Sequence, residues 1–160
     1  MRIYKNRPFH SDVSRPLNAA AELQDPSILQ IQRLPARSTV IPAGRAGVYY
    51  RNKECSDRLY SLNGEYRFAL FSETAPEGFE RPEFDSSDWD ALEVPSMWQF
   101  QGYGEPTYPN TEYAFPFDPP YIDRLNPVGC YIKKFTVDAP ACRSILHFSG
   151  VDNAFYAYLN

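Results

Sequence analysis

The sequence is poor in the side chains on which catalytic and metal chemistry most often depends. Its 160 residues include two histidines, His10 and His147, and three cysteines, Cys55, Cys130 and Cys142. No His/Cys group has the spacing of a zinc site, and no glycine-rich loop precedes a helix to cradle a phosphate. His147 lies in an alternating stretch, which favours a packed or rim histidine over a base. We therefore expect neither a catalytic residue nor a metal ligand in this chain.

Long apolar runs are also missing. None approaches the roughly 18 residues that a transmembrane helix needs. The first residues, MRIYKNRPFHSD, are charged rather than apolar, unlike a signal peptide. An odd number of cysteines does not suit a disulfide framework. These absences predict a cytoplasmic protein that does not enter a membrane.

Positive charge is scarce overall but unevenly distributed. The net charge is −4. Residues 1–58 hold ten Lys and Arg against five Asp and Glu, whereas residues 59–160 hold six against fifteen. Because the basic residues of the first part are scattered and form no block or stripe, we expect no nucleic-acid partner.

What the sequence has in abundance is proline and aromatic residues. Fifteen prolines and an aromatic content of 16% favour short strands and shaped loops over helices. We expect strands at 64–71, after a turn near Trp89, and within 129–138, 143–151 and 154–160.

These strands predict an all-β sandwich over residues 59–160, preceded by an irregular extended arm over residues 1–58. One segment of the arm, DPSILQIQRL, can form a short helical turn, and its Ile28, Ile31 and Leu34 can share a face. Since the chain stops in the middle of a predicted strand, we expect it to be the front of a longer polypeptide with an incomplete first domain.

Eight acidic side chains of the predicted sandwich are interpreted as a solvated surface, because nothing selects the two facing carboxylates that a glycosidase needs. They are Glu65, Glu73, Glu77, Glu80, Glu83, Asp85, Asp88 and Asp90.

The stretch from Pro95 to Tyr131 combines prolines and glycines with exposed-looking aromatics. Sugar sites pair aromatic faces with amide groups that fix hydroxyls. The residues of those types are Trp98, Tyr103, Tyr108, Asn110, Thr111 and Tyr113. The alternative is that aromatics such as Trp98, Tyr113 and Phe115 only bury the loop. Packing is favoured for Trp98, whereas both interpretations remain open for Asn110.

Four segments, in fixed order and spacing, carry a family resemblance. They are SLNGEYRFALF (61–71), DSSDWDALEVPSMWQFQGYGEPTYPNTEYAFPF (85–117), NPVGCYIKKFTV (126–137) and ILHFSGVDNAFYAYLN (145–160). Together with a fainter match in the arm, they cover roughly residues 22–160. A lone SLNGE would be weak, but all four in sequence are specific. The chain resembles the start of the large β-galactosidases of glycoside hydrolase family 2.

This resemblance implies a jelly-roll domain of the sugar-binding, galactose-binding-like type, here truncated at its C-terminal end. It implies retaining hydrolysis of terminal β-galactosides such as lactose, with both catalytic glutamates in a TIM barrel outside this chain, so that the fragment alone is inactive. Mg²⁺ and Na⁺ are expected for the full-length enzyme, with no ligands assignable here. The remaining domains are the expected partner, and the full-length protein is expected to be a homo-oligomer.

The family's Y-x-N-x-x-Y-P loop hydrogen-bonds the galactose through its Asn, which corresponds to Asn110, with Thr111 beside it. The chain departs from the pattern at Ala114, where the family has Pro, and the restraint on φ is lost there. Two alternatives stay open: a free-standing carbohydrate-binding sandwich, and a complementing subunit of a two-chain β-galactosidase.

Overall fold

The computed structural model describes residues 21–36, 38, 40–41, 56, 58–72, 74–106, 121, 126–137, 144–152 and 154–159. In chain order, its elements are the 3₁₀ helix η1 (Ala21–Gln24), strand β1 (Gly64–Phe71), strand β2 (Asp90–Val94), the 3₁₀ helix η3 (Trp98–Gln101) and strand β3 (Val128–Ile132). This part of the chain contains strands and short 3₁₀ turns but no α-helix. The all-β class expected from the sequence is therefore confirmed.

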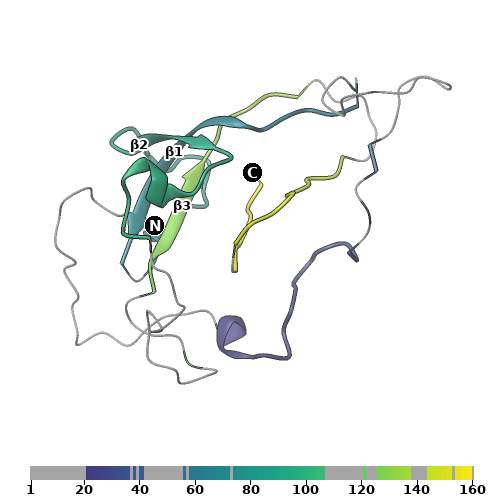
Figure 1. Cartoon of the computed structure of the whole chain (residues 1–160), viewed down its shortest axis with the longest axis horizontal. Coiled ribbons are helices and arrows are strands. Elements are labelled where there is room, and N and C mark those ends of the chain that lie inside the picture. Colours follow the sequence, from purple (N-terminus) through teal and green to yellow (C-terminus); the bar gives the residue numbers. More distant parts are fainter. Residues whose placement is uncertain are drawn as a thin grey trace.

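The three strands form one antiparallel sheet in the order β2–β1–β3 (Figure 1). β1 pairs with β2 along residues 64–68 and with β3 along residues 67–71. β1 is rich in aromatic residues, which suit a pleated surface packed against neighbours. It is the central strand and contributes three of the seven buried apolar residues described.

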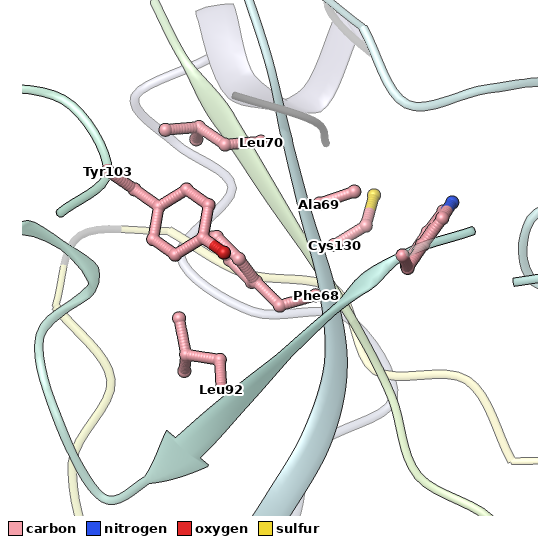
Figure 2. Packing of buried hydrophobic residues seen from close by; sticks show 7 residues of the cluster. Phe68, Ala69, Leu70, Leu92, Tyr103 and Cys130 are labelled. Atoms are coloured by element: carbon pink, nitrogen blue, oxygen red, sulfur yellow. The ribbon is translucent and has the colours of Figure 1, made fainter. Parts of the chain in front are cut away.

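Both faces of the sheet are covered at its centre. Phe68, Ala69 and Leu70 are 1%, 2% and 0% exposed. Because successive strand side chains point to opposite faces, three buried neighbours require cover on both sides. Figure 2 shows Phe68 and Leu70 on the side of Tyr103, with Ala69 and Cys130 across the strand.

Loops rather than a second sheet cover these two faces among the described residues. On the first face, the segment of η3 places Trp98 and Tyr103 against Phe68. On the second face, the ring of Trp89 lies 5.5 Å from that of Phe84. The Nη1 of Arg67 donates a hydrogen bond of 3.1 Å to the carbonyl of Trp89 and ties that loop to β1.

The turn and strand predicted around Trp89 are confirmed. The Trp89 N–H donates to the Ser86 carbonyl at 3.0 Å, and β2 follows at once. The strand ends before a cis Val94–Pro95 bond, as expected where proline removes a backbone donor.

The strands predicted toward the C-terminal end are shorter than expected or not formed. β3 stops at Ile132, although a strand was predicted over 129–138. The ammonium of Lys133 donates to the carbonyls of Asn63 and Glu65, at 3.2 Å each. These two carbonyl groups are therefore bonded by the Lys133 side chain rather than by the backbone of a longer β3. Beyond it, the strand predictions within 143–151 and 154–160 are wrong for the residues described, because these are exposed and pair with no strand there.

The described arm residues do not pack as predicted. Ile28, Ile31 and Leu34 are 40%, 52% and 43% exposed. A single turn does occur near the predicted place, with the Ile28 N–H donating to the Asp25 carbonyl at 3.0 Å, and η1 lies just before it. The division of the chain at residue 58 stays a prediction.

Candidate functional site

The predicted sugar loop divides into a described stem and a tip. Tyr108, Asn110, Thr111 and Tyr113 lie outside the described residues. Trp98 and the residues up to Pro106 form the stem that leads to them. The site is therefore built from the stem.

The two aromatic side chains of the stem belong to the core. Trp98 is half-buried, with its ring 6.1 Å from Phe68. Tyr103 is 2% exposed, and its ring meets Phe68 edge-on at 4.8 Å. Trp98 therefore packs against the core, which is the alternative favoured for it from the sequence. Figure 2 shows Tyr103 directed into the same cluster.

Glycines set the path of the stem after η3. Gly102 has φ 87 and Gly104 has φ 66, in the left-handed region that glycine adopts without strain. The Gly102 N–H donates to the Gln99 carbonyl and the Tyr103 N–H to the Trp98 carbonyl, both at 3.1 Å. This nested pair resembles a Schellman ending and turns the chain so that Tyr103 enters the core.

A short hydrogen bond fixes the far end of the Tyr103 side chain. Its hydroxyl donates to Oδ2 of Asp90, the first residue of β2, at 2.6 Å. Burial of the ring and the nearby Asp90 carboxylate both raise the pKa of Tyr103 above its usual value. The phenol therefore stays protonated and donates at every ordinary pH.

A second contact joins the stem to the outer edge of β2. The side-chain amide of Gln101 donates through Nε2 to the Glu93 carbonyl at 2.9 Å. Its Oε1 accepts from the Glu93 N–H at 3.1 Å. One amide thus satisfies both backbone groups that a neighbouring strand would use.

An open cleft of about 600 Å³ lies beside β1, β3 and the 83–87 turn. It is lined by Glu65, Tyr66, Arg67, Glu83, Phe84, Asp85, Ser86, Ser87, Ile132, Lys133 and Lys134. Charges of both signs surround it, and the ammonium of Lys133 already binds two backbone carbonyls. The Ser87 backbone N–H and side chain hydrogen-bond Asp85 and lower its pKa, so this carboxyl stays ionised.

The described residues hold no group of three His, Cys, Asp or Glu side chains that could bind a metal ion. His147 is exposed rather than packed, because the predicted strand that would have buried it does not form. Cys130 is buried, and burial raises the pKa of its thiol. The acidic residues interpreted as surface are exposed, except that Glu73 lies outside the described residues.

Among the described residues, no helix has the length and apolar character to cross a membrane.

The stem contacts were not predicted. Tyr103 was considered as a loop aromatic, but Asp90 was interpreted only as surface, and Gln101 and Glu93 were not considered together. A usable signal exists in the sequence: Asp90 begins the strand, and a Gln–Gly–Tyr–Gly run follows it after one short helical turn.

Comparison with known protein families identifies the family of the chain. The profile described as "Glycosyl hydrolases family 2, sugar binding domain" matches residues 59–160. The chain belongs to this family and carries its sugar-binding domain. The sandwich predicted from the sequence is the fold of that domain, whereas its jelly-roll topology stays a prediction.

Several relatives are named β-galactosidases. The chain is 36% identical to that of Pectobacterium atrosepticum over 151 residues, covering 91% of the chain and 14% of the relative. It is 35% identical to that of Photobacterium profundum over 144 residues, covering 86% of the chain and 14% of the relative. It is 43% identical to that of Vibrio cholerae over 106 residues, covering 62% of the chain and 10% of the relative. The chain therefore spans between 10% and 14% of the length of these curated relatives.

Proposed function

We propose that this chain is the N-terminal segment of a retaining β-galactosidase that hydrolyses terminal β-galactosides such as lactose. The observation that carries the proposal is the match of residues 59–160 to the family's sugar-binding domain, together with 36% identity to a β-galactosidase over 91% of the chain. The catalytic glutamates lie outside this chain, and the chain alone is inactive.

Within that enzyme, the loop after the stem supplies a substrate contact. Asn110 hydrogen-bonds the galactoside, Thr111 lies beside it, and Tyr108 and Tyr113 line the loop. The support for this role is the stem itself, which is tied to the core by aromatic packing and to β2 by hydrogen bonds. A loop with a fixed base loses less conformational entropy when it binds.

Large exposed apolar side chains support assembly with further protein. Ile145, Phe148, Tyr156 and Leu159 are between 47% and 63% exposed, and such surface usually marks an interface. The partner is the remaining part of the enzyme, in the same polypeptide or as a separate subunit, in a cytoplasmic homo-oligomer. Mg²⁺ and Na⁺ serve that enzyme, and no ligand for either ion is assigned in this chain.

A chimeric enzyme tests the proposal. The chain replaces its aligned segment in the Pectobacterium atrosepticum β-galactosidase, and hydrolysis of nitrophenyl-galactoside is measured. We expect activity from the chimera and none from the enzyme lacking that segment or from the chain alone. Activity restored by mixing the two pieces would identify a complementing subunit, whereas a soluble, folded and inactive chimera would contradict the proposal.

Asn110→Ala in the chimera tests the substrate contact. Loss of one hydrogen bond to the sugar should lower kcat/KM by an amount equivalent to about 1–3 kcal/mol, without a change in melting temperature. Asn126→Ala serves as a control on an amide outside the loop. An unchanged kcat/KM for Asn110→Ala would reject the loop's role.

A further inference from the structure

We propose that Gln101 and Tyr103 are positioning residues, which hold the base of the loop on β2 and so set where Asn110 meets the galactoside. This inference rests on the proposed function. We call the two contacts, Gln101 with the backbone of Glu93 and Tyr103 with the carboxylate of Asp90, the stem clamp.

The geometry of Gln101 requires a side chain that both donates and accepts a hydrogen bond. It donates to the carbonyl of Glu93 and accepts from the N–H of the same residue. Only a side chain that is at once donor and acceptor can make both bonds. This pairing holds η3 at a fixed distance from the outer edge of β2.

Tyr103 holds the stem from the inside. Its ring is almost fully buried against Phe68, and its hydroxyl donates to Asp90 at 2.6 Å. A hydroxyl that donates to a carboxylate forms one of the stronger and shorter hydrogen bonds in proteins. The stem is thus held at two points on either side of Gly102.

The clamp lies close to the loop in the sequence, so its loss should change the position of the loop. Tyr103 is followed by Gly104, and Asn110 lies six residues after that glycine. Neither clamp contact contributes to the pairing of β2 with β1, which runs through the backbone along residues 64–68. Loss of the clamp should therefore release the stem while the sheet remains. A displacement of about 1 Å in a substrate-positioning group can reduce a rate by up to roughly a hundredfold.

The first test is substitution in the chimera. We expect Gln101→Ala and Tyr103→Phe each to lower kcat/KM on the order of tenfold. Gln99→Ala and Tyr131→Phe are matched controls. Gln99 lies on the same turn, and its side-chain amide makes no hydrogen bond among the described residues. Tyr131 packs on the same Phe68 ring at 4.7 Å. Both controls should keep the unsubstituted kcat/KM.

A pH profile separates positioning from a general structural role. In Gln101→Glu, the ionised carboxylate can accept from Glu93 but cannot donate to it, whereas the protonated carboxyl does both. The kcat/KM of Gln101→Glu, divided by that of the unsubstituted chimera at the same pH, should therefore rise as pH falls toward about 5. A ratio that does not change with pH would contradict the role of the amide.

A double-substitution cycle decides whether the clamp acts through Asn110. In an Asn110→Ala background, Gln101→Ala and Tyr103→Phe should have almost no further effect on kcat/KM. Effects that persist in full there would overturn the inference. If Asn110→Ala lowers kcat/KM and neither clamp substitution does, the inference fails and the proposed function stands. If Asn110→Ala itself has no effect, the substrate contact of the proposed function fails.

Discussion

At the scale of single residues, tyrosines show how burial controls charge in this chain. Tyr131 is half-buried beside Phe68, and burial raises its pKa to about 12. Burial also raises the pKa of Tyr66 and Tyr103, and the Asp90 carboxylate raises that of Tyr103 further. These phenols keep their protons in the folded chain at pH values where an unfolded chain releases them.

Stability should therefore fall at alkaline pH. The usual pKa of tyrosine is about 10. Below that pH, both the folded and the unfolded chain hold the proton of Tyr131, and its full contribution to the free energy of unfolding is present. As pH rises from about 10 toward 12, the unfolded chain loses that proton first, so the free energy of unfolding decreases. Urea unfolding of the purified chain at a series of pH values measures this loss.

Substitution assigns the alkaline loss to the buried ring. Tyr131→Phe should reduce the loss above pH 10, because no proton is then released on unfolding. The same substitution at Tyr121, which is 67% exposed, should leave it unchanged. Equal pH dependence in the chain and in Tyr131→Phe would rule out this assignment.

At the scale of elements, the turn after η3 depends on one backbone conformation. Gly102 has φ 87, and a residue with a Cβ is strained there by about 1–2 kcal/mol. Gly102→Ala should therefore reduce the free energy of unfolding by about that amount, as measured by urea unfolding. Gly150, with open space around it and no positive φ, provides the control: Gly150→Ala should cost much less.

The strands that could be predicted are those whose pattern is supported by local neighbours. β1 follows the alternation after Gly64, and β2 ends where Pro95 removes a donor, so both were visible in the sequence. The end of β3 was not, because it depends on Lys133 reaching two carbonyls that are distant in the sequence. The stem clamp was missed for a different reason: a Gln side chain that bonds a strand edge leaves no periodic pattern in the sequence.

At the scale of the whole molecule, the described core is small and the exposed apolar surface is large. Seven apolar residues are buried, all in or next to the three-stranded sheet. The segments 144–152 and 154–159 run apart from that sheet in Figure 1, although Tyr158 meets Phe79 with ring centroids 5.8 Å apart. Three strands with packed faces are close to the minimum for independent stability.

This imbalance predicts a difference between the isolated chain and the chimera. Amide hydrogens in 144–152 and 154–159 should exchange quickly in the isolated chain, because they pair with no strand there, and slowly in the chimera. Those of β1 should be protected in both. Hydrogen exchange followed by mass spectrometry measures this, and equally fast exchange of the C-terminal segments in an active chimera would exclude them from its interface.

The two hydrogen bonds between Gln101 and Glu93 also bear on what polymer chemists call the functionality of the monomer, the number of sites at which it can add another monomer. A sheet with two free edges is bifunctional, and edge-to-edge addition can extend it without limit into a filament. With the Glu93 backbone groups already bonded to Gln101, that position on the outer edge of β2 cannot pair with an added strand. One glutamine side chain thereby removes one point of addition from the outer edge of this sheet.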